Sequence, residues 1–128
     1  MIRIIFSNLM VLFVTACAQP SDFSKDVNGQ VLQQFKDSGV DLDKEYVVDF
    51  CHLFVDEESA KNMANEVVEI FLDVEVDIYV DEDPISVCVS RKMVPTHKSI
   101  TMAEYAFAGI ANKHGGVSDG WGFMVDSL

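Results

Sequence analysis

Two consecutive segments in which apolar and polar residues alternate constrain the fold of this chain more than any other feature. Residues 74–80 read VEVDIYV, and residues 85–90 read ISVCVS after an acidic turn that ends at Pro84. Strict alternation is typical of a strand with one packed face and one face in water. The two segments therefore predict a hairpin whose apolar face must be covered by other elements of the chain.

Two helices are expected before this hairpin, because apolar residues recur there at helical spacing. The first ends before Gly39, and Ser21 or Asp22 is its expected N-cap. The second begins after Asp56, whose side chain suits a cap position. The apolar stripes of the two helices consist of Phe23, Val27, Val31, Leu32 and Phe35, and of Ala60, Met63, Ala64, Val67, Val68, Phe71 and Leu72.

A third, longer helix is expected between the hairpin and the glycine pair at residues 115–116, which ends it. Ser99 or Thr101 is its expected N-cap. Thr101 followed three residues later by Glu104 fits a capping box, in which each side chain satisfies a free backbone N–H group.

Residues 45–55, rich in Val, Phe and Tyr, and residues 121–125 predict two more strands. The element order is then a helix followed by β-α-β-β-α-β. This order predicts an α+β fold, a ferredoxin-like sandwich with strand order 4-1-3-2 and an extra N-terminal helix. The chain has 128 residues, which is enough for one such domain.

The first 18 residues differ from the rest of the chain. Arg3 precedes an apolar run from Ile4 to Val14, and small residues follow, as in a secretory signal. The run is shorter than the roughly 20 residues that a membrane-spanning helix needs. Residues 14–17 (VTAC) resemble the lipobox of bacterial lipoproteins, which implies cleavage after residue 16 and acylation of Cys17.

This interpretation predicts a signal peptide (residues 1–16), a linker (17–22) and a domain (23–128), anchored to a membrane by acyl chains. Ala18 after the acylated cysteine implies outer-membrane sorting, with the domain facing the periplasm. Two alternatives stay open. Residues 16–18 (ACA) also fit an ordinary signal site cleaved before Gln19, and the segment could be retained in a cytoplasmic protein as a buried strand.

The charge of the chain argues against nucleic acid as a partner. Nine basic and 21 acidic residues give a formal net charge of −12, and no basic cluster offsets the repulsion of a phosphate backbone. An acidic surface favours basic protein partners, because it attracts them over long distances. We therefore expect no nucleic-acid binding.

Two runs near the C-terminus resemble motifs of one known family. Residues 115–122 (GGVSDGWG) are similar to the closing motif of the regulator of ribonuclease activity B family, with Ser118 where that family has Tyr. Residues 92–96 (KMVPT) resemble the motif that ends one of its strands. The resemblance covers roughly residues 23–126. Its motif residues, which are also candidate interaction residues, are Met93, Pro95, Asp119, Gly120, Trp121 and Gly122.

The resemblance implies regulation without catalysis. The best-known members of the family bind the scaffold region of the endoribonuclease RNase E and restrain it. RNase E is the expected partner of this chain only if the chain is cytoplasmic. An exported, lipid-anchored chain is expected to bind a different protein, because fold does not fix function.

Trp121, Cys51 and Cys88 each allow two interpretations. The only Trp of the chain either packs the last strand onto the helices or is exposed as a binding anchor. Cys51 and Cys88 are expected on neighbouring strands, both on the face away from the helices. In an exported protein they could form a disulfide, and otherwise they are two thiols.

No motif in the sequence indicates an enzyme, a metal site or a cofactor. His52, His97 and His114 fall in separate elements, whereas a zinc site needs three or four convergent ligands. His114 is better explained by the dipole at a helix C-terminus. Two further functions remain as alternatives: an acidic periplasmic immunity or inhibitor protein, and a small hydrolase that uses a metal or paired carboxylates.

Overall fold

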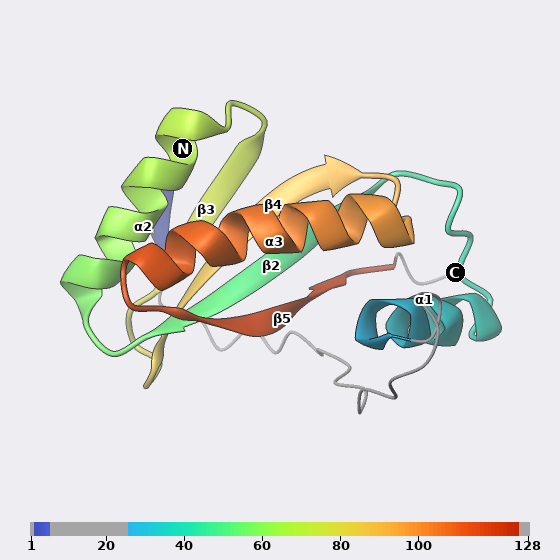
Figure 1. Cartoon of the computed structure of the whole chain (residues 1–128), viewed down its shortest axis with the longest axis horizontal. Coiled ribbons are helices and arrows are strands. Elements are labelled where there is room, and N and C mark those ends of the chain that lie inside the picture. Colours follow the sequence, from blue (N-terminus) through green and yellow to red (C-terminus); the bar gives the residue numbers. More distant parts are fainter. Residues whose placement is uncertain (1, 6–25, 126–128) are drawn as a thin grey trace.

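A twisted sheet with helices on one face forms the part of the chain that the structure describes (Figure 1). The structure is a computed structural model and describes residues 2–5 and 26–125. Their helices and strands are β1 (Ile2–Ile5), α1 (Val27–Asp37), β2 (Tyr46–Phe54), α2 (Glu57–Ile70), β3 (Val74–Tyr79), β4 (Ile85–Met93), α3 (His97–Lys113) and β5 (Val117–Phe123).

The structure confirms the predicted α+β class and the α-β-α-β-β-α-β order that follows β1. The sheet order is β1-β3-β4-β2-β5, so its last four strands have the predicted 4-1-3-2 arrangement. Neighbouring strands among these four are antiparallel. The alternating segments form the predicted β3–β4 hairpin, in which Val76 lies opposite Val89 and Ile78 lies opposite Val87.

The hydrophobic core lies between the sheet and the two long helices, α2 and α3, which cross its face (Figure 1). The four aliphatic residues of the hairpin named above are fully buried in it. Phe107 of α3 contacts two other rings edge to face, that of Phe50 on β2 at 5.3 Å and that of Phe71 at 5.1 Å between centroids. The apolar face of the hairpin is therefore covered as the alternation requires.

Two of the predicted helix starts are wrong. The N-cap of α1 is Asp26, whereas the expected caps Ser21 and Asp22 lie outside the described residues together with Phe23. The N-cap of α3 is Thr96, which forms a capping box with Ser99. Ser99 is thus the third residue of the helix, and Thr101 lies within it.

The start of α2 is as predicted, but its end differs. Asp56 is its N-cap, and the carboxylate accepts a hydrogen bond from the Ser59 backbone at 2.7 Å. The helix ends at Ile70, so the last two residues of the predicted apolar stripe, Phe71 and Leu72, lie beyond it. Leu72 is 96% exposed and does not belong to the buried stripe, because the chain has already turned towards β3.

The last strand is longer at its start than predicted and ends earlier. β5 begins at Val117, which pairs with Leu53 of β2, and it ends at Phe123 instead of residue 125. Gly115 follows α3 with a positive φ of 84°, and the Gly116 N–H group donates to Ala111 O. This confirms that the glycine pair ends the helix.

Residues 2–5 form a strand, the element that the retained-segment alternative allowed although no alternation in the sequence predicts it. β1 is parallel to β3 at the edge of the sheet, with Ile2 opposite Val76. Ile2 is partly buried against the core. No helix within the described ranges is long and apolar enough to cross a bilayer.

We predict opposite effects for two Gly→Ala substitutions. A Cβ at Gly116 would overlap the Phe54 ring, so Gly116→Ala should lower the free energy of unfolding by roughly 1–3 kcal/mol. A Cβ at Gly109 in α3 would meet no atom within 4 Å. Gly109→Ala should therefore raise the free energy by about 0.5–1 kcal/mol, because alanine favours a helix. Urea unfolding of both variants measures the two changes. A Gly116→Ala variant as stable as the unsubstituted protein would contradict the packing of Phe54 against Gly116.

Candidate functional site

The family-like closing motif forms most of β5. Gly120 has a φ of +108°, a value that favours glycine, and it lies opposite Cys51. Trp121 lies opposite Phe50, which places its ring on the helix side of the sheet. Only 5% of Trp121 is exposed. Of its two interpretations, the structure supports the packing role and not the exposed anchor.

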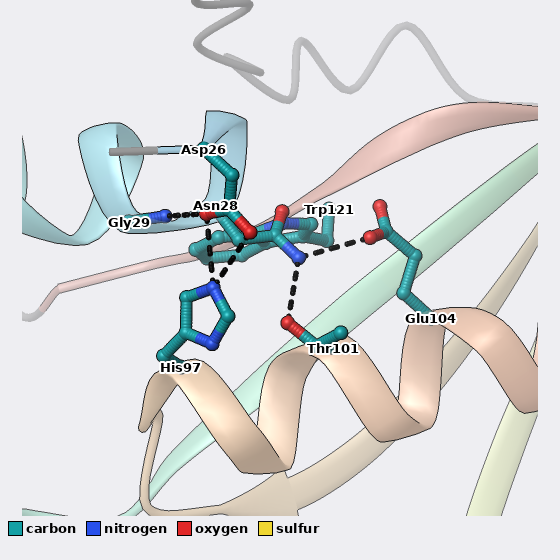
Figure 2. A network of polar contacts seen from close by, with 7 residues as sticks. All are labelled: Asp26, Asn28, Gly29, His97, Thr101, Glu104 and Trp121. Atoms are coloured by element: carbon teal, nitrogen blue, oxygen red, sulfur yellow. Dashed lines mark hydrogen bonds and ion pairs between the residues drawn. The ribbon is translucent and has the colours of Figure 1, made fainter. Parts of the chain in front are cut away.

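Asn28, in the first turn of α1, joins three elements through one buried amide (Figure 2). The Trp121 indole Nε1 donates to Asn28 Oδ1 at 2.8 Å. Asn28 Nδ2 donates to Thr101 Oγ1 at 3.1 Å and to Glu104 Oε1 at 3.0 Å. Thr101 and Glu104, the pair expected as a capping box, therefore bind Asn28 on the side of α3.

A second contact links the starts of α1 and α3 (Figure 2). His97 Nε2 lies 2.8 Å from the carboxylate of Asp26, the N-cap of α1. The same carboxylate accepts a hydrogen bond from the Gly29 backbone at 2.8 Å. The hydrogen bond from Gly29 lowers the pKa of Asp26 below its ordinary value, and the contact with His97 lowers it further by a smaller amount.

Stacked aromatic rings complete the junction of α1 with the sheet. Phe35 of α1 stacks on Phe123 of β5 at 4.3 Å between centroids, and Tyr46 of β2 stacks on Phe123 at 4.7 Å. Trp121 lies 6.3 Å from Phe35. The closing motif thus docks the extra N-terminal helix onto the sandwich.

The other motif residues lie at the end of β4, just beyond it and on β5. Met93 is the last residue of β4 and packs against the core, and Pro95 is buried just beyond it. Asp119 is exposed, whereas Gly122 is buried opposite Asp49. Cys17, the predicted lipidation site, lies outside the described residues.

Cys51 and Cys88 lie directly opposite each other on β2 and β4 and are joined by a disulfide. They share the sheet face opposite the helices with Tyr79, and all three residues are buried. The cross-link closes a loop with a sequence separation of 37 residues. Closing a loop of this length in the unfolded chain stabilises a fold by about 4 kcal/mol.

The same face carries carboxylates beside the disulfide. Asp77 lies opposite Cys88, and Asp49 lies opposite Ser90, whose hydroxyl donates to it. Burial raises the pKa of Asp49, and the Asp77 charge acts in the same direction, against the hydrogen bond from Ser90. Two carboxylates, those of Asp49 and Asp77, therefore lie beside the disulfide on this face of the sheet.

The three histidines do not converge. His52 pairs with Val87 in the sheet and lies on the core side, away from Cys51 and Cys88. His97 contacts Asp26, and His114 Nε2 lies 3.0 Å from Glu66 Oε1, which links α3 to α2. Among residues 2–5 and 26–125, no three His, Cys, Asp or Glu side chains form a group that could hold a metal.

The fold and its junction define a class: a ferredoxin-like α+β domain with an added helix, locked by a tryptophan near its C-terminus. A family model of the regulator of ribonuclease activity B matches residues 25–123, and the chain belongs to this family. Membership of this family of non-catalytic regulators indicates that the chain is not an enzyme. No curated protein matches the chain.

Sequence reasoning missed Asp26 and Asn28. The available signal was the position of Asn28 on the apolar stripe of α1, three and four residues before Val31 and Leu32. A polar residue on a buried stripe indicates a specific hydrogen-bond partner. The partners could not be found in this way, because they lie 73 and more residues away in the sequence.

We predict that Asn28→Ala lowers the free energy of unfolding by about 2–3 kcal/mol, because the buried Trp121 N–H group loses its acceptor. In a double-mutant cycle with Trp121→Phe, the coupling should be roughly 1 kcal/mol. Asn112→Ala, on the exposed side of α3, is the matched control and should change stability by less than about 0.5 kcal/mol. Additive effects of the two core substitutions would contradict the hydrogen bond.

We predict acid sensitivity from His52, which is 1% exposed. Burial lowers the pKa of His52 from 6.5 to about 4, against a hydrogen bond with the Val87 backbone. In the unfolded chain His52 is protonated below about pH 6.5, whereas in the folded chain it is protonated only near pH 4. Stability should therefore be unaffected above pH 6.5 and fall by about 3 kcal/mol towards pH 4. Unfolding at pH 7 and pH 4.5 should show a smaller loss in His52→Leu, and an equal loss would exclude His52 as the cause.

Proposed function

We propose that this chain is a regulator that acts by binding a protein and is held in the cell envelope by a lipid on Cys17. The regulatory part of the proposal is carried by one observation, the family match over residues 25–123. The buried motif agrees with it, because Trp121 and Asn28 pack inside the domain and its outer surfaces are left for contacts.

Two observations support export. Residues 1–18 have the charge, apolar run and lipobox-like VTAC sequence described above. The disulfide between Cys51 and Cys88 is the second, because disulfides persist in the periplasm and outside cells, whereas the cytosol keeps thiols reduced. The two observations lie in separate parts of the chain and point to the same compartment.

The proposed location decides the partner. The family suggests RNase E, which a cytoplasmic form of this chain would bind. An exported form would instead bind an envelope protein with a basic surface, since the chain has a formal charge of −12. This charge also favours the second candidate function, an acidic immunity or inhibitor protein that neutralises a basic toxin or enzyme.

The intact mass and cell fraction of the protein, expressed in a bacterial host that processes lipoproteins, test the anchor. We expect a membrane-bound species whose mass equals residues 17–128 plus acyl chains. Cys17→Ala should abolish acylation and release the protein from the membrane fraction. Cys51→Ala is the matched cysteine control, and it should remain acylated.

A full-length, unmodified protein in the cytosol would overturn the proposed anchor. RNase E would then be the first partner to test, with purified full-length chain. For the anchored form, partners that co-purify without cross-linking should dissociate as salt rises, because screening weakens attraction between exposed charges. A salt-independent complex would contradict electrostatic recognition.

A further inference from the structure

The outer edge of β3 has a strand partner only while residues 2–5 are part of the chain. β3 pairs with β4 on one side and with β1 on the other. The pairing with β1 is parallel, and it runs from Ile2 opposite Val76 to Ile5 opposite Tyr79. This edge of the sheet is therefore able to accept an extended segment.

The proposed cleavage after residue 16 would remove β1, so the inference below rests on the proposed function. The remaining domain keeps its core, because the buried core residues of the described ranges all lie between Val31 and Val89 or between Ile100 and Phe123. The family match likewise begins at residue 25 and does not include β1. Residues 18–128, which are the mature chain without the acylated Cys17, are thus expected to fold on their own, with β3 as an edge strand.

We propose that the outer edge of β3 in the mature chain binds an extended segment of the partner protein, which adds a parallel strand in the position of β1. Strand addition of this kind gains affinity from backbone hydrogen bonds and specificity from alternate side chains. Once β1 is removed, the backbone N–H and C=O groups of β3 that pair with it in the full chain supply the hydrogen bonds.

The chemistry of the bound segment follows from the residues along β3. Val76 and Ile78 are fully buried and belong to the core side of the strand, so residues opposite them should be aliphatic. Asp77 is on the other face, and a basic residue opposite it would stabilise the strand pair through attraction of opposite charges. The sequence of β1 has this pattern, with isoleucines at the positions of Val76 and Ile78 and an arginine at that of Asp77.

A second copy of this chain is a poorer occupant of the edge. Antiparallel self-pairing of β3 centred on Val76 would place Glu75 opposite Asp77 of the other copy. Self-pairing centred on Asp77 would place the two Asp77 residues opposite each other. Like charges directly opposite each other destabilise a strand pair, so the acids of β3 favour a basic partner segment over a copy of themselves.

The test uses residues 18–128 and a fluorescent peptide that contains the β1 sequence, Ile-Arg-Ile-Ile, between Gly-Ser flanks. We expect saturable binding, and slower amide hydrogen exchange in β3 but not in β5. Full-length chain with Cys17→Ala should bind the peptide at least about tenfold more weakly, because its own β1 occupies the edge at high effective concentration.

Peptide variants keep the test independent of protein folding. Glu in place of Arg should weaken binding about tenfold, since it faces Asp77, and Pro in place of the third residue should abolish binding. Tyr105→Ser, on the exposed side of α3, is the control in the protein and should leave binding unchanged.

Unchanged exchange in β3, equal binding of the Glu and Arg peptides, or a dimer of residues 18–128 that protects β3 would overturn the proposal. These outcomes are distinguishable from failure of the proposed export. A chain that keeps residues 1–16 in its host would refute cleavage, whereas peptide binding to the truncated protein would still show that the edge accepts a strand.

Discussion

Burial of one face of an antiparallel sheet is the constraint on which the rest of this structure depends. The aliphatic residues of the β3–β4 hairpin lose all contact with water only because α2 and α3 lie across them. This arrangement fixes which residues of each strand face the helices. It also leaves the opposite face to polar and acidic residues and to the disulfide, so the two sides of the sheet have different chemistry.

The extra helix α1 adds a second layer of dependence. It docks through its apolar stripe, in which Val31 and Leu32 are buried, and through a buried amide and stacked rings. The Asn28 side chain satisfies the indole N–H group of Trp121 and reaches two residues of α3. Because buried polar groups are costly when unpaired, this network specifies one position for the helix.

The sequence predicts the strand order and most of the elements, because alternation and helical spacing report burial directly. It fails where a choice depends on contacts distant in the sequence. Thr101 and Glu104 have the spacing of a capping box, yet Thr96 caps the helix and they bind Asn28 instead. Leu72 continues an apolar stripe but lies past the end of its helix. The pairing of residues 2–5 with β3 has no local signal at all.

The disulfide has a consequence for how the sheet is assembled. Successive residues of a strand point to opposite faces, so a slip of one residue between β2 and β4 would move one cysteine to the helix side. The two sulfur atoms can meet only when the central strands are aligned as in the native sheet. Oxidation therefore cross-links β2 and β4 only in their native register. A chain with misaligned strands stays without the cross-link and can still rearrange.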